Sequence, residues 1–81
     1  MRIIGNIPHP VVHITVFSMN DKYVIKFEAG QMEQVYKINQ TEIGGMESIQ
    51  KLLDEDFMKK ITARFNEMFL SLKAAKENNN L

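Results

Sequence analysis

The chain has 81 residues, ten basic and ten acidic side chains, and no cysteine. These totals exclude disulfide bonds, thiolate catalysis and Cys-ligated zinc, and they leave no net charge that would attract nucleic acid or an acidic membrane. The apolar share of 44% is that of a folded protein, and the length allows one domain with a modest core. Because no run of eighteen apolar residues and no signal-peptide pattern occurs, we expect a cytoplasmic protein without a membrane segment.

The amino-terminal segment, residues 1–10, is predicted to be either an ordered arm or an edge strand. Residues 1–7 are apolar but contain Gly5, and Pro8 and Pro10 impose an extended corner after them.

Residues 11–38 predict an antiparallel β-meander of three strands, with residues 1–7 as a possible fourth. The runs 11–19, 22–29 and 32–38 are rich in β-branched and aromatic residues. Asn20-Asp21 suits a two-residue type I′ turn, whereas Gly30-Gln31 suits a type II′ turn. These turns pair Met19 with Lys22 and Ala29 with Met32, which fixes the face on which each side chain lies.

One face of this meander is almost wholly apolar and is predicted to be the core. Its members are Val12, Ile14, Val16, Tyr23, Ile25, Phe27, Met32, Tyr36 and Ile38, with Ser18 and Gln34 as the polar exceptions. The other face, which we call the mixed face, combines apolar and charged side chains. Its members are Val11, His13, Thr15, Phe17, Met19, Lys22, Val24, Lys26, Glu28, Glu33, Val35 and Lys37.

The carboxyl-terminal part, residues 46–77, is predicted to be helical. A loop over 39–45 precedes a short helix over 46–53 that turns Ile49, Leu52 and Leu53 inward. Residues 54–77 form a long amphipathic helix with three acids in its first turn, and Asp54 is a good N-cap. The helical spacing of apolar residues continues from the short helix into the long one, but the three acids favour a break near Asp54. Residues 78–81 are expected to be a frayed polar tail.

The long helix is predicted to extend past the sheet that it covers. Residues 54–77 would span ~36 Å, whereas a compact domain of this length is roughly 30 Å across. Its overhanging Met68, Phe69 and Leu72 would be exposed in a monomer, and such apolar patches usually mark an interface.

Candidate catalytic and metal-binding residues have simpler structural explanations. His9 and His13 lie on extended chain, where ~13 Å separates them, too far for one ion. The acids 54–56 are explained by helix capping. Gly44-Gly45 matches no phosphate-loop pattern. We therefore expect no cofactor, no metal and no enzymatic activity.

The mixed face suggests two kinds of partner. Phe17, Val24 and Val35 could pack against a second subunit together with the helix overhang. Alternatively, Lys22, Lys26 and Lys37 beside Phe17 could bind single-stranded nucleic acid weakly. A plain solvated face is the third reading. We favour self-association, with a dimer as the expected assembly.

Three segments, IGNIPHP, ITVFSMNDKYVIKFEAGQMEQVYKI and LLDEDFMKKI, resemble a family of small bacterial proteins of unknown function over nearly the whole chain. This resemblance implies no activity and no site residues. Separately, strands followed by one long helix look like the purine-rich-element-binding repeat, which dimerises through its helices and binds single strands on its sheet. This likeness is one of layout, and the balanced charge counts against it.

Overall fold

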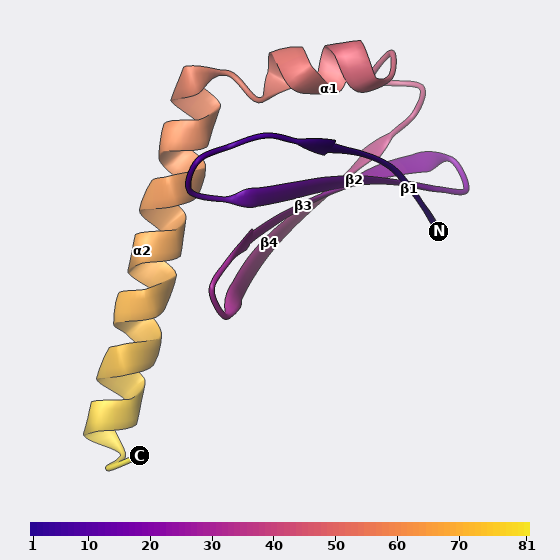
Figure 1. Ribbon diagram of the computed structural model, residues 1–81. Helices are drawn as coiled ribbons and strands as arrows, with labels where there is room; N and C mark the ends of the chain where they lie inside the picture. Colours follow the sequence, from indigo (N-terminus) through magenta and orange to yellow (C-terminus); the bar gives the residue numbers. More distant parts are fainter.

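The computed structural model describes residues 1–81 and shows an α+β protein with an open antiparallel sheet (Figure 1). The strand order β1-β2-β3-β4 is that of a simple meander, and the two helices follow it. The predicted fold class is therefore confirmed, and the amino-terminal segment is a fourth strand. The elements are β1 (Arg2–Ile7), β2 (His13–Met19), β3 (Lys22–Ala29), β4 (Met32–Asn39), α1 (Met46–Leu52) and α2 (Glu55–Asn78).

The register of the meander is the predicted one. Met19 pairs with Lys22 and Ala29 pairs with Met32, so both hairpins have two-residue loops. The expected type I′ turn at Asn20-Asp21 is wrong, because Asn20 has a φ of 55° and Asp21 does not have a positive φ. A positive φ at the first loop residue alone is the pattern of a type II′ turn, which Gly30, at 59°, also follows.

Strand β1 pairs with β2 but is irregular. The pairing shifts between Ile3 and Gly5, which marks a β-bulge. A Cβ atom at Gly5 would lie 2.9 Å from Cε of Met46 in α1. The end of the Met46 side chain therefore occupies the space beside the glycine, which is the same residue that interrupts the apolar pattern of the strand.

The core lies between one sheet face and the two helices. The predicted core face is confirmed, since its central side chains are buried and the others pack at their edges. Helix α2 contributes Met58, Ile61 and Phe65, and α1 contributes Ile49. Gln34, a polar exception on that face, donates from Nε2 to the carbonyl oxygen of Ile61 at 2.9 Å. The buried apolar residues of this core are Val12, Ile14, Val16, Ile25, Phe27, Ile49, Met58, Ile61 and Phe65.

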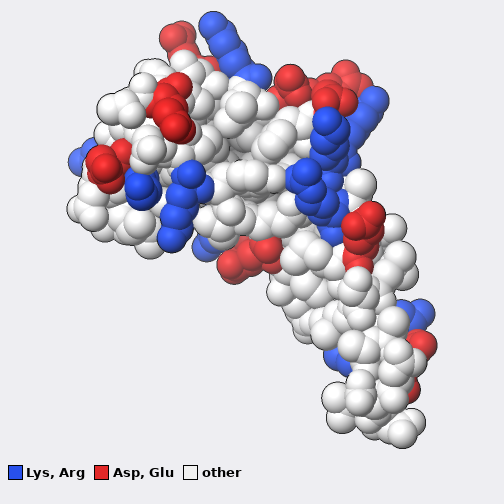
Figure 2. Space-filling view, turned by 180° about the vertical axis from the view of Figure 1, so that it is seen from behind, with Lys and Arg blue, Asp and Glu red and all other residues white.

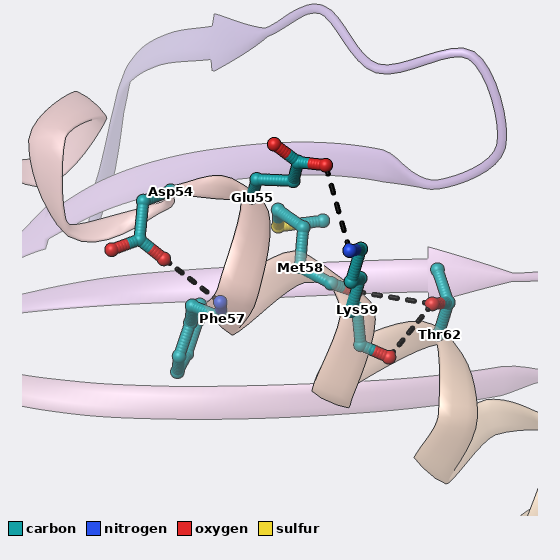
Figure 3. Close-up of polar contacts among 6 residues, drawn as sticks. All are labelled: Asp54, Glu55, Phe57, Met58, Lys59 and Thr62. Carbon is teal, nitrogen blue, oxygen red and sulfur yellow. Dashed lines mark hydrogen bonds and ion pairs between the residues drawn. The ribbon is translucent and has the colours of Figure 1, made fainter.

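The predicted break between the helices is confirmed at Leu53 and Asp54. Oδ1 of Asp54 accepts the amide N–H of Phe57 at 2.8 Å and so caps α2 (Figure 3). The two acids after it form exposed i,i+4 ion pairs with Lys59 and Lys60. One detail of the prediction is wrong: Leu52, the last residue of α1, is exposed, whereas Ile49 is buried and Leu53 packs against the core.

Residues 78–81, which we expected to be a frayed tail, are exposed and form hydrogen bonds that cap α2. Asn80 takes a φ of 56°, and its amide N–H donates to the carbonyl of Glu77 at 3.3 Å. The amide of Leu81 reaches the carbonyl of Lys76 at 2.8 Å. These two bonds form a Schellman motif with asparagine in the left-handed position, where glycine is more common.

Candidate functional site

The carboxyl-terminal half of α2 leaves the sheet and projects beyond it (Figure 1). The helix packs on the core as far as the β3–β4 turn, where the Phe69 ring lies over Gly30. From residue 69 onward every residue is exposed. The exposed fractions of Phe69, Leu70 and Leu72 are 41%, 57% and 40%, and Met68 is half-buried. The overhang therefore carries uncovered apolar surface, and all three predicted residues lie at its base.

The molecule as a whole exposes more surface than a compact monomer. Its radius of gyration is 14.7 Å, whereas about 12 Å is typical of 81 residues. Its accessible surface is 5728 Å², against about 5,000 Å² expected for a compact protein of this mass. The surplus, roughly 700 Å², is close to the ~800 Å² that one partner contributes to a standard protein interface.

A groove of about 570 Å³ runs between α2 and β4. Residues of these two elements alone form its walls, so it opens at the β4 side of the sheet. Arg64 is held at its wall by a hydrogen bond of 2.8 Å from its Nη1 to the hydroxyl of Tyr36. The sequence indicated Met68 and Leu72 but not the polar residues of this groove. Its lining residues are Met32, Gln34, Arg64, Glu67, Met68, Ser71 and Leu72.

The apolar residues of the mixed face differ in exposure. Val24 lies centrally between its cross-strand neighbours Phe17 and Lys37 and is only 6% exposed. Its side chain is therefore already buried within the chain, without a partner. Phe17 is half-buried, whereas Val35 on the terminal strand β4 is 48% exposed. Only Val35 among these three offers substantial apolar surface to another molecule.

The basic residues of the mixed face are partly engaged within the chain. Nζ of Lys26 lies 5.5 Å from the centre of the Phe17 ring and 3.5 Å from Oε1 of Glu28. Nζ of Lys22 donates to Oδ1 of Asn39 at 3.0 Å. Acidic and basic side chains alternate over the body of the molecule in the view of Figure 2, while the projecting end of α2 is mostly uncharged. The lysines thus do not form an open basic track beside a free ring.

The two histidines lie in different surroundings, His9 at the corner before β2 and His13 in β2. Nδ1 of His9 accepts the amide N–H groups of Val11 and Val12, both at 3.2 Å, and so shapes the corner before β2. His13 lies on the mixed face opposite Glu28. The structure contains no cluster of three or more His, Cys, Asp or Glu side chains arranged to hold a metal ion.

Comparison of the chain with protein-family models, curated proteins and solved structures finds no match. Neither helix combines the length and the apolar character that crossing a membrane requires.

Proposed function

We propose that this protein is a small non-enzymatic interaction protein that works as a homodimer. The observation that carries this proposal is the surplus surface of about 700 Å², together with the apolar overhang of α2. A helix that continues its apolar stripe beyond its own core exposes surface that a partner would cover.

A second copy of the same chain is the partner that the molecule suits best. Only 11 of its 81 residues are buried, and domains of this size often gain stability from a second subunit. The equal numbers of acids and bases give the two copies no net repulsion. Each chain also has both the apolar overhang and an open groove. A twofold interface uses the same patch on both copies, so the patch must be self-complementary.

Binding of single-stranded nucleic acid is less well supported. A base would have to displace Lys26 from the Phe17 ring, and Lys26 is already paired with Glu28. The remaining contacts would be made mainly by the exposed Lys37, which is too little charge for a phosphate track.

The proposal is tested by placing a charge on the overhang and measuring the molar mass by light scattering. Leu72→Glu puts a carboxylate in the groove and should shift the protein toward the 9.4 kDa monomer. Leu72 is preferable to Phe69, because Phe69 also packs on Gly30. Ala74→Glu, about 200° around the helix from Leu72, is the matched control and should leave the dimer intact. A Leu72→Glu protein that keeps the parent mass would show that the overhang is not at the interface.

A further inference from the structure

The outer edge of β4 carries backbone groups that have no partner in the chain. Gln40 donates its amide N–H to the carbonyl of Asp21 at 2.8 Å and continues the β3–β4 register beyond Asn39. Hydrogen-bonded and non-bonded pairs alternate along an antiparallel ladder, so the even-numbered residues of β4 bond to β3. The N–H and C=O groups of Glu33, Val35 and Lys37 therefore point away from the sheet. No hydrogen bond outside the regular elements uses them.

The two edges of the sheet differ in how well they could accept another strand. Edge strand β1 has a bulge between Ile3 and Gly5, and Pro8 follows it. Such features prevent edge-to-edge pairing. Edge strand β4 pairs with β3 over eight consecutive residues without a bulge, and it contains no proline. Only β4 presents a straight ladder of donors and acceptors.

We propose that β4 pairs antiparallel with β4 of a second copy, with Val35 on the twofold axis. This inference rests on the proposed dimer and specifies its geometry. The two four-stranded sheets would then form one continuous sheet of eight strands, a symmetric form of strand addition. Backbone hydrogen bonds from Glu33, Val35 and Lys37 of each copy would join the two edges.

The charges of the edge select this register among the three that are possible near the strand centre. With Val35 opposite Val35, Glu33 of each copy faces Lys37 of the other, and two ion pairs form on the mixed face. Centring the pair on Tyr36 would place Val35 opposite Lys37, and centring it on Gln34 would place Glu33 opposite Val35. Opposite charges directly across a strand pair stabilise it, so the register centred on Val35 is favoured.

The surroundings of the three residues fit this pairing. Glu33 and Lys37 are exposed and form no ion pair within the chain. Val35 between them is more exposed than Phe17 or Val24, the other apolar residues compared on the mixed face. The groove between α2 and β4 lies at the same edge of the sheet, on its core face. The second copy would therefore lie next to Met68 and Leu72, where the overhang needs cover.

The first test exchanges the charges. Glu33→Lys alone creates two lysine–lysine pairs across the axis, and Lys37→Glu alone creates two glutamate–glutamate pairs. Each variant should dimerise on the order of tenfold more weakly than the parent. Mixing the two variants should restore the parent affinity, because the heterodimer pairs lysine with glutamate at both positions. Sedimentation velocity of each variant and of the mixture measures the dissociation constant of the dimer. A mixture no tighter than its components would overturn the register.

The second test uses the absence of cysteine from the chain. In the proposed pair the two Val35 Cα atoms lie ~5.5 Å apart, within the range that a disulfide spans. Val35→Cys should give a disulfide-linked dimer on mild oxidation, whereas Glu47→Cys on the exposed side of α1 should give only slow collisional product. If the mass is that of a dimer but Val35→Cys does not cross-link faster than Glu47→Cys, the strand pairing is wrong and the dimer proposal stands. A monomer at all concentrations would overturn both proposals.

Discussion

The two halves of α2 carry the same apolar stripe in different surroundings. In the first half, Met58, Ile61 and Phe65 point into the core and are at most 8% exposed. In the second half, Phe69 and Leu72 continue the stripe at helical spacing but are about 40% exposed. The sheet ends at the β3–β4 turn while the helix continues, so burial is determined by what lies opposite and not by the helix itself.

In the proposed dimer the two halves of α2 would perform different tasks. The first half holds the domain together, because its side chains lose their contact with water within one chain. The second half contributes little to the fold of the monomer, and its capped end keeps it helical beyond the last tertiary contact. A helix end with exposed apolar side chains and no cover from its own chain is suited to association. Four substitutions test this division, in order of decreasing expected effect.

Ile61→Ala should have the largest effect, because Ile61 is fully buried at 0% exposure. Removing its side chain from the core should cost about 2–5 kcal/mol of unfolding free energy. Urea denaturation should show this loss equally at every protein concentration. Leu72→Ala is the comparison, and its effect should grow with protein concentration, since it weakens association. Equal losses of unfolding free energy for Ile61→Ala and Leu72→Ala, independent of protein concentration, would show that the two halves of α2 do not differ in their roles.

Gly30→Ala tests the point where the two halves meet. Gly30 has a φ of 59°, and an added Cβ would lie 3.3 Å from Cζ of Phe69. The positive φ alone should cost about 1–3 kcal/mol for a residue with a side chain. Thermal unfolding measures it, with Ala29→Gly as a control for glycine content in the same hairpin. No loss of stability would mean that the turn readily changes its conformation.

Asp54→Ala removes the side-chain cap of the first half. The amide of Phe57 would lose its acceptor at 2.8 Å, and the expected cost is about 1 kcal/mol. Asp54→Asn keeps an acceptor oxygen and should retain most of the stability. Chemical denaturation of the three proteins distinguishes capping from a general charge effect, which would affect both variants alike.

Asn80→Ala should have the smallest effect on global unfolding, because the second half has few tertiary contacts. The left-handed residue of the Schellman motif would be strained, so the last turns of α2 should exchange their amide hydrogens faster. Asn80→Gly should slow that exchange again. Hydrogen exchange followed by mass spectrometry resolves the two halves. A large drop in global stability would show that the helix end belongs to the core.

The register and the core face could be predicted because two short turns specify them. Asn20 and Gly30 both accept positive φ, and once the loops have two residues every side chain of β2 to β4 is assigned to a face. The Asp54 cap could be predicted equally well, since its side chain bonds to the first turn of the helix that directly follows it. Local chemistry therefore supported these predictions.

The remaining features depend on contacts that the local pattern does not show. Gly5 and Pro8 obscured β1, because Gly5, which interrupts the strand pattern, lies at the bulge and next to the Met46 side chain. Burial of Val24 depends on neighbours from two other strands. Only the strand order shows that β4 lies at an edge of the sheet. In an edge strand, the spacing of Glu33, Val35 and Lys37 is self-complementary.

The molar mass of the unmodified protein in solution shows whether the chain forms a dimer. Light scattering on a sizing column, at low and moderate salt and over a dilution series, should give about 19 kDa, twice the chain mass of 9.4 kDa, with dissociation only on dilution. A mass of 9.4 kDa at all concentrations would rule out the dimer. The overhang of α2 and the edge of β4 would then have to be covered by a different molecule.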